Sequence, residues 1–145
     1  MARAAKTTKA APPAEGFRRA RAAHATELAE DYTEAIADLI DAKGEARVVE
    51  LARAMGVSHV TVVRTIARLH RDKLVVAQPH KEVLLTASGR AMARASKRRH
   101  RVVVAFLRAL GVSPRVAERD AEGIEHHVSE ETLAAMERFA GAHAP

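Results

Sequence analysis

Apolar side chains recur every three or four positions between Glu15 and Lys43, which predicts a long amphipathic helix that Gly44 is placed to end. Its apolar stripe consists of Leu28, Tyr32, Ile36, Leu39 and Ile40. A second stripe is acidic and consists of Glu27, Asp31, Glu34, Asp38 and Asp41. Periodicity alone does not determine which of these carboxylates, if any, turns towards the rest of the protein.

Two shorter helices are predicted over residues 46–69, joined by a tight turn. Gly56 is placed to end the first helix, and Ser58 is a good N-cap for the second. In the second helix Val62, Ile66 and Leu69 recur at intervals of four and three, which fixes its inner face. This arrangement is a helix-turn-helix, whose second helix enters the major groove of DNA.

The outer face of this second helix carries the residues that we expect to contact DNA. They lie near the N-terminus of the helix and away from its apolar face: His59, Val60, Thr61, Arg64 and Thr65. Side chains in this position can reach base edges or phosphates. Arg64 is the best candidate for a guanine or phosphate contact.

A β-hairpin is predicted directly after the recognition helix. Residues 74–85 contain two short β-branched runs around a turn at residues 78–81. A hairpin in this position makes the domain a winged helix. Lys81, at the tip of this wing, is expected to lie near backbone phosphate.

The remainder of the chain is predicted to be helical. Thr86 is placed to cap a helix that runs to about Leu110, Ser113 and Pro114 open the next helix, and Ser129 opens the last one. The apolar faces of these helices are larger than a solvent-exposed tail needs. We therefore expect a homodimer interface, which also suits a helix-turn-helix protein that reads a two-fold symmetric operator.

Charge and composition narrow the classes of partner. The net charge is +6, and from Arg64 to Arg101 there are eleven Lys or Arg residues against two acidic ones. This basic stretch favours double-stranded DNA, whereas the scarcity of aromatic residues disfavours single-stranded nucleic acid, which proteins bind by stacking bases on aromatic side chains. No apolar run is long enough to span a membrane, and the N-terminus lacks a secretory signal, so we expect a cytoplasmic protein without a membrane partner.

Candidate metal ligands lie in the helix predicted after Pro114. Glu122, Glu125 and His126 are spaced by three and four residues, so a helix would direct all three from one face. Cysteine is absent, and nitrogen and oxygen donors of this kind suit manganese, iron or zinc. The alternative interpretation is an acidic helix face that only contacts solvent.

The order of these features resembles the DtxR family of metal-dependent transcriptional regulators, and within it the branch of manganese transport regulators. The most specific similarity lies in three segments: Glu30-Asp-Tyr-Thr-Glu-Ala-Ile36, Gly111-Val-Ser-Pro114 and Arg119-Asp-Ala-Glu-Gly-Ile-Glu-His-His-Val-Ser-Glu-Glu-Thr-Leu133. The resemblance implies six metal ligands from three helices: Asp31, Glu34, His100, Glu122, Glu125 and His126. Such a set could hold a pair of close divalent ions in each subunit. A carboxylate at Asp31, where iron-responsive relatives have a methionine, implies Mn²⁺ rather than Fe²⁺.

The predicted elements and the resemblance together imply a domain division and a function. We expect a mainly α fold with a disordered basic arm (1–14), a winged helix-turn-helix domain with a small two-stranded wing (15–86), and an all-α metal-binding and dimerisation domain (87–145). The expected function is a dimeric repressor of manganese-uptake genes, for which Mn²⁺ is the corepressor and operator DNA the partner. One alternative is an iron-responsive regulator of the same family.

Two further alternatives belong to other classes of protein. A binuclear metalloenzyme is disfavoured, because the chain contains neither the Glu-x-x-His spacing of di-iron bundles nor a His-Glu-x-x-His motif. A winged-helix regulator of a small organic ligand would leave the acidic cluster without a role. We therefore expect no enzyme activity and no small organic substrate.

Overall fold

A computed structural model describes residues 13–143, and nearly all of them are helical or lie in short connections. The helices are α1 (Pro13–Lys43), α2 (Val48–Met55), α3 (His59–Arg71), α4 (Ala87–Ala109), α5 (Pro114–Ile124), the 3₁₀ turn η1 (Glu125–His127) and α6 (Glu130–Ala142), and the strands are β1 (Val75–Val76) and β2 (Leu84–Leu85). Helix α1 begins two residues before the predicted Glu15, so the last two residues of the arm expected over 1–14 are helical instead. The rest of that arm, residues 1–12, lies outside the described part of the chain. No helix between residues 13 and 143 is both long and apolar enough to cross a bilayer.

The N-terminal half is a winged helix built around one apolar core. Tyr32 and Ile36 of α1 pack there with Leu51 of α2 and with Val62 and Leu69 of α3, all of them buried. Gly56 ends α2 in the left-handed conformation that glycine adopts without strain (φ 65°), and the hydroxyl of the N-cap residue Ser58 accepts a hydrogen bond from a backbone N–H of α3. The predicted helix-turn-helix is confirmed in the structure.

The wing is a minimal antiparallel hairpin, in which Val75 pairs with Leu85 and Val76 with Leu84. A close junction joins it to α4. The Thr86 hydroxyl accepts a hydrogen bond from the Gly89 backbone N–H at 3.0 Å and caps the helix. A Cβ at Gly89 would lie only 2.0 Å from the Leu74 carbonyl oxygen, so this helix can start so close to the wing only with glycine there.

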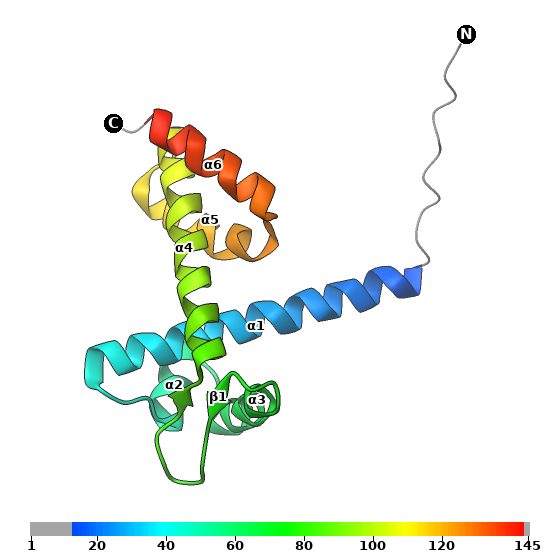
Figure 1. Cartoon of the computed structure of the whole chain (residues 1–145), viewed down its shortest axis with the longest axis vertical. Coiled ribbons are helices and arrows are strands. Elements are labelled where there is room, and N and C mark those ends of the chain that lie inside the picture. The colour runs from blue at the N-terminus through cyan, green and yellow to red at the C-terminus, as the bar shows by residue number, and fades with distance from the viewer. Residues whose placement is uncertain (1–12, 144–145) are drawn as a thin grey trace.

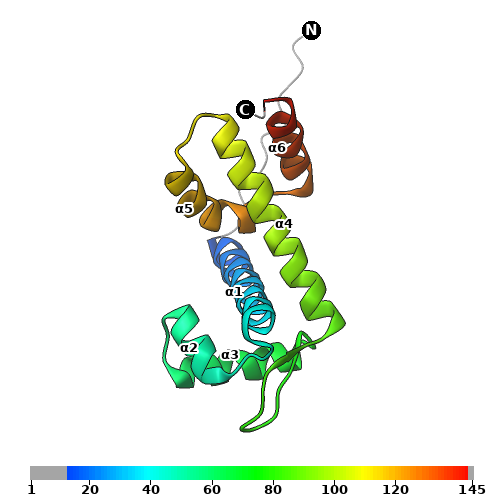
Figure 2. The same cartoon turned by 90° about the vertical axis from the view of Figure 1, so that its left-hand side faces the viewer.

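Helix α4 connects the two halves of the molecule (Figures 1 and 2). Its first part crosses α1, where Lys97 forms an ion pair with Asp38. Its second part packs with α5 and α6 around a separate apolar core that includes Val103 and Leu133. The mainly α fold predicted from the sequence is therefore confirmed, and the two halves have distinct hydrophobic cores.

Candidate metal centre

The candidate ligands meet where α1, α4 and the α5–η1 segment approach one another. The sequence predicted one helix that directs Glu122, Glu125 and His126 from a single face. This prediction is wrong in detail, because α5 ends at Ile124 and both Glu125 and His126 lie in the 3₁₀ turn η1. A 3₁₀ turn has three residues per turn, so side chains after Ile124 no longer follow the α-helical face. The three residues consequently divide between two groups.

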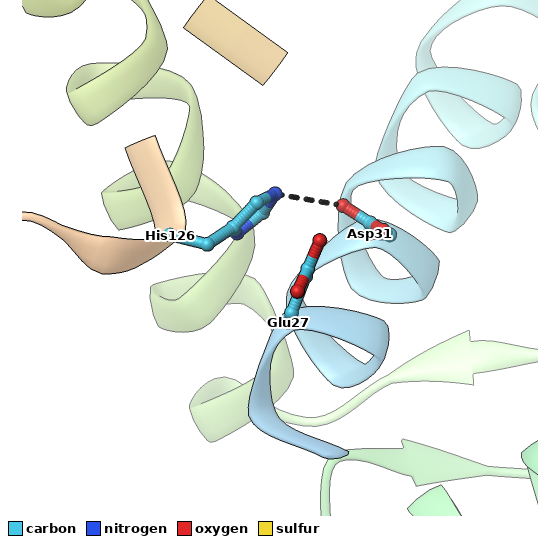
Figure 3. A group of neighbouring side chains, drawn as sticks. All are labelled: Glu27, Asp31 and His126. Carbon is cyan, nitrogen blue, oxygen red and sulfur yellow. Dashed lines mark ion pairs between the residues drawn. The ribbon is translucent and has the colours of Figure 1, made fainter. Parts of the chain in front are cut away.

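The first of these, the Asp31 group, consists of Glu27, Asp31 and His126 (Figure 3). One ligand atom of each residue lies within 4.8 Å of those of the other two. The His126 Nε2 atom lies 3.1 Å from Asp31 Oδ1, and the His126 side chain is only 2% exposed. Because Glu27 and Asp31 belong to α1 and His126 to η1, this group joins the winged helix to the C-terminal half.

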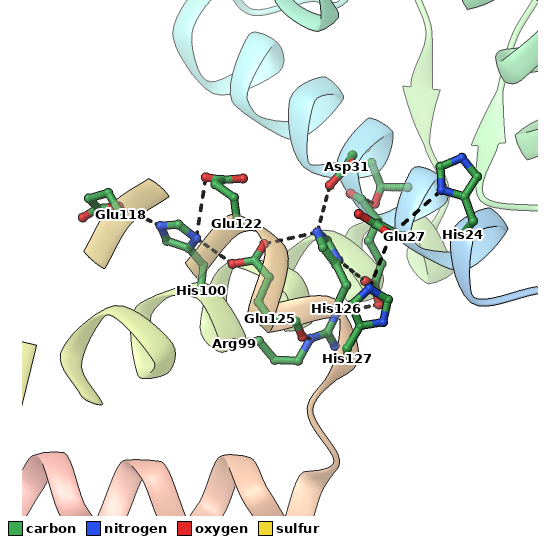
Figure 4. A network of polar contacts seen from close by, with 12 residues as sticks. His24, Glu27, Asp31, Arg99, His100, Glu118, Glu122, Glu125, His126 and His127 are labelled. Atoms are coloured by element: carbon green, nitrogen blue, oxygen red, sulfur yellow. Dashed lines mark hydrogen bonds and ion pairs between the residues drawn. The ribbon is translucent and has the colours of Figure 1, made fainter. Parts of the chain in front are cut away.

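The second, the His100 group, consists of His100, Glu122 and Glu125 (Figure 4). The His100 Nδ1 atom lies 2.6 Å from Glu125 Oε2 and 3.7 Å from Glu122 Oε1. All three residues belong to the C-terminal half. The basic run around His100 gave no local sign of this geometry, which only the family resemblance had implied.

Glu125 lies between the two groups and faces both. Its Oε2 atom contacts His100 Nδ1, while its Oε1 atom lies 3.6 Å from His126 Nε2. The carboxylate is 3% exposed, so its two oxygens are held towards opposite imidazoles by the surrounding protein. A carboxylate in this position can bridge two cations.

Outer partners orient both imidazoles. Glu30 accepts a hydrogen bond from His126 Nδ1 at 2.7 Å and forms an ion pair with Arg99 at 2.5 Å. Arg99 Nε in turn donates to the backbone oxygen of Glu125 at 3.1 Å. Metal-binding histidines commonly donate their second ring N–H to a carboxylate in this way, which leaves the other nitrogen free to bind the ion. Glu118 has the corresponding place at His100, 2.8 Å from Nε2.

Burial and crowding disfavour the charged form of the buried acids. Desolvation raises the pKa of Glu125 to about 7, against the opposing attraction of His100 and His126. Desolvation also raises the pKa of Asp31, where the attraction of His126 is countered by repulsion from Glu27 and other carboxylates. Both effects express the cost of holding several negative charges together without a cation.

The pKa values of both imidazoles are raised, which favours their protonated form. Burial by itself lowers the pKa of His100, but hydrogen bonds to Glu118 and Glu125 outweigh it and raise the pKa. At His126 the same balance holds, and the hydrogen bond to Glu30 is the largest of the raising effects. Protons and a divalent cation therefore compete for the same carboxylates and imidazoles.

The donor set fits a hard or borderline divalent cation. It offers carboxylate oxygens and imidazole nitrogens without any thiolate, which is the chemistry that suits manganese, iron or zinc. The structure brings together five of the six predicted ligands in the two groups. Glu34 joins neither group, although it lines the same open pocket as Asp31, Glu122 and His126. Glu27 was not among the predicted ligands, although it belongs to the acidic stripe one turn before Asp31.

The residues predicted to contact DNA are exposed, with one exception. His59, Val60, Thr61 and Arg64 of α3 are exposed, as is Lys81 at the wing tip. Thr65 is 8% exposed, and its hydroxyl donates to the backbone oxygen of Thr61 at 3.0 Å, so its placement on the outer face was wrong. It lies next to Ile66 on the inner side of the helix. Val63, which was not among the predicted DNA contacts, is exposed on the outer side instead.

Comparison with known protein families gives two matches. The N-terminal DNA binding domain of the iron dependent repressors matches residues 24–83. Their metal binding and dimerisation domain matches residues 86–144. The boundary between the two lies at the wing–α4 junction, where the structure changes from one core to the other.

Individual relatives agree with this assignment. The chain is 51% identical over 129 residues to the transcriptional regulator MntR of Escherichia coli O157:H7, over 89% of this chain and 83% of the relative. It is 40% identical over 100 residues to the HTH-type transcriptional regulator MntR of Geobacillus kaustophilus, over 69% and 71% of the two chains.

Solved structures show the same fold. A manganese-dependent transcriptional repressor in complex with manganese is 34% identical with a TM-score of 0.70, over 78% of this chain and 52% of the other. The structure of T. acidophilum IdeR is 30% identical with a TM-score of 0.66, over 76% and 53% of the two chains. The chain thus spans about half the length of these two structures. Taken with the two domain matches and the shared identity, this fold shows that the chain belongs to the iron dependent repressors, the DtxR family of metal-dependent transcriptional regulators.

Proposed function

We propose that the protein is a manganese-responsive repressor that binds operator DNA as a homodimer. The observation that carries this proposal is the Asp31 group, in which α1 of the DNA-binding half and η1 of the C-terminal half meet through Asp31 and His126, 3.1 Å apart. The relatives named as manganese regulators support manganese as the effector. A repressor of this type would act on manganese-uptake genes.

The proposed ligands remain the six implied by the sequence: Asp31, Glu34, His100, Glu122, Glu125 and His126. Five of them lie in the two groups, and Glu34 lines the adjoining pocket. The position of Glu125 between two imidazoles supports a pair of ions in each subunit. Hard carboxylate donors on α1 support Mn²⁺ over Fe²⁺ as the effector.

The coupling between metal binding and the arrangement of the two halves follows from charge. Two unit negative charges about 5 Å apart repel by roughly 3 kcal/mol at the effective dielectric of a partly buried site. A divalent cation bound among the carboxylates supplies the positive charge that cancels this repulsion. Asp31 and His126 then hold α1 against η1, which fixes the angle between the winged helix and the C-terminal half. Coupling energies of about 1–3 kcal/mol are sufficient for allosteric control, so the repulsion that a bound cation cancels is large enough.

DNA binding is assigned to α3 and the wing. The proposed contacts are His59, Val60, Thr61, Arg64 and Lys81, all of them exposed. The match to a dimerisation domain supports a homodimer, in which two α3 helices would enter successive major grooves. The cytoplasmic location expected from the sequence remains a prediction.

Fluorescence anisotropy with a labelled operator tests this proposal. The operator is first selected from random duplex DNA with the Mn²⁺-treated protein, and its affinity is then measured with and without Mn²⁺, and with Fe²⁺ under anaerobic conditions. We expect Mn²⁺ to tighten binding by about 5–150-fold. Equal affinity with and without metal would contradict a metal-responsive repressor, and a stronger response to Fe²⁺ would favour the iron-responsive alternative.

Arg64→Ala tests the assignment of the DNA-binding face. Loss of a base or phosphate contact should weaken operator binding by about 1–3 kcal/mol. Mn²⁺ affinity, measured by isothermal titration calorimetry, should not change, because Arg64 lies on α3 and in neither metal group. Loss of both affinities together would contradict separate DNA and metal sites.

A further inference from the structure

Glu27 lies beside Asp31 and His126 but is not one of the six proposed ligands. It lies four residues before Asp31 on α1, so the two carboxylates are neighbours on one helical face. A Glu27 carboxylate oxygen lies within 4.8 Å of the candidate ligand atoms of Asp31 and His126 (Figure 3). Atoms bound at roughly 2.0–2.5 Å from one ion lie no more than about 5 Å apart, so these three side chains can share a cation.

The other neighbours of Glu27 are imidazoles. His127 Nε2 lies 3.6 Å from its Oε2 atom, and His24 Nδ1 lies 4.0 Å from the same atom (Figure 4). Within residues 13–143, no Lys or Arg lies within 4.0 Å of this carboxylate. In contrast, Glu30, on the same helix, forms an ion pair with Arg99. Among the described residues, Glu27 is therefore a half-buried carboxylate without a Lys or Arg partner, beside the Asp31 carboxylate and the His126 imidazole.

We propose that Glu27 is an additional ligand of the cation held by Asp31 and His126, and that His127 positions its carboxylate. This proposal rests on the proposed function, because it adds a residue to the same metal centre. Glu27 adds a hard oxygen donor and one negative charge to the donors supplied by Asp31 and His126. Hard donors favour Mn²⁺ over more nitrogen- and sulfur-preferring ions, so Glu27 contributes to selectivity as well as to affinity.

The test uses the full chain and compares Glu27→Gln with Glu15→Gln. Both substitutions remove one carboxylate charge from α1, but Glu15 pairs with Arg19 and belongs to neither metal group. Mn²⁺ and Zn²⁺ dissociation constants are measured by competition with a fluorescent chelator. Glu27→Gln should weaken Mn²⁺ binding by about 10–100-fold and Zn²⁺ binding by less, whereas Glu15→Gln should leave both unchanged.

Two further variants separate the alternatives. Asp31→Asn reports whether the metal centre itself exists. Glu27→Asp keeps the negative charge on a shorter side chain and should retain part of the Mn²⁺ affinity. If Asp31→Asn weakens Mn²⁺ binding and Glu27→Gln does not, Glu27 is only a partner of the two exposed imidazoles and the inference is overturned. Absence of Mn²⁺ binding by the native protein would overturn the proposed function together with this inference.

His127→Gln tests the positioning role. The substitution removes the nearer of the two imidazoles beside Glu27 and leaves every proposed ligand in place. We expect Mn²⁺ affinity to fall, but by less than in Glu27→Gln, and to show no further loss when the two substitutions are combined. Independent, multiplying losses in the double variant would contradict a role for His127 through Glu27.

Discussion

The Asp31 group and the His100 group have similar donors but different places in the fold. The Asp31 group takes two carboxylates from α1 and an imidazole from η1, so it spans the two halves of the molecule. The His100 group takes all its residues from α4, α5 and η1, within one half. Binding energy in the first group can therefore change the angle between the halves, whereas binding energy in the second stabilises a single domain.

The carboxylates that orient the two imidazoles also differ, in how far they are exposed to solvent. The side chain of Glu30, which orients His126, is 11% exposed and forms an ion pair with Arg99, which is 15% exposed. Glu118, which has the corresponding place at His100, is 62% exposed. The carboxylate that orients His126 is thus enclosed by protein, whereas the one that orients His100 is largely exposed to solvent. We infer that the first determines coupling to DNA and the second mainly sets metal affinity.

The largest effect is expected from Glu125→Gln, because this carboxylate faces both groups. Mn²⁺-dependent operator binding should fall by about 100-fold or more, which anisotropy measures directly. Without metal, the variant should melt at the same temperature as the native protein or higher near pH 8. Burial raises the pKa of Glu125 to about 7, so the charged carboxylate that the substitution removes is disfavoured at that pH. A native response to Mn²⁺ in this variant would show that Glu125 does not serve both groups.

Asp31→Asn and His100→Gln separate the groups. Both should weaken Mn²⁺ binding by about 10–100-fold at the affected group. Asp31→Asn should also abolish the effect of Mn²⁺ on operator affinity, whereas His100→Gln should retain that effect at higher Mn²⁺ concentration. Atomic absorption measures the Mn²⁺ bound per chain, and anisotropy measures operator affinity on the same samples. Equal loss of the DNA response in both variants would remove the distinction between coupling and affinity.

Glu30→Gln and Glu118→Gln compare the outer partners. Glu30→Gln should lower Mn²⁺ affinity by about 10–100-fold, because a metal-binding imidazole loses its charged partner. It should also lower the free energy of unfolding by about 1–3 kcal/mol, because Arg99 is left without a carboxylate in a buried position. Glu118→Gln should change the affinity by less than about 5-fold, since exposed ion pairs contribute about 0–1 kcal/mol. Calorimetric titration and thermal unfolding of both variants measure these differences.

A smaller effect is expected from pH. The pKa values of Asp31, His100, Glu125 and His126 are all raised in the folded protein, so the folded state binds more protons than the unfolded chain. The metal-free protein should therefore lose stability as pH rises, for Glu125 between its ordinary 4.5 and about 7. Mn²⁺ competes with these protons, so the increase in melting temperature on adding Mn²⁺ should grow over the same interval. Calorimetry at about pH 5.5, 6.5 and 7.5 tests both signs, and a constant increase would contradict proton–metal competition.

Local signals in the sequence predicted most of the elements correctly. Gly56, Ser58 and Thr86 mark helix ends because their caps depend on backbone geometry and hydrogen bonds within a few residues. The face of α3 was predicted less well. Periodicity identified its buried apolar residues, but Thr65 is also buried, because a threonine can satisfy its hydroxyl on the preceding turn and then pack against the core.

By itself, the sequence determined the order of elements and the helix-turn-helix with its wing, and its resemblance to the family implied six candidate ligands. Only the tertiary structure decided how those side chains are divided. It ends α5 at Ile124, turns Glu125 between two imidazoles, and brings Glu27 beside Asp31 and His126. The physical reason is that caps and periodicity act over a few residues, whereas a metal site is assembled from segments almost a hundred residues apart, as at Glu30 and His126.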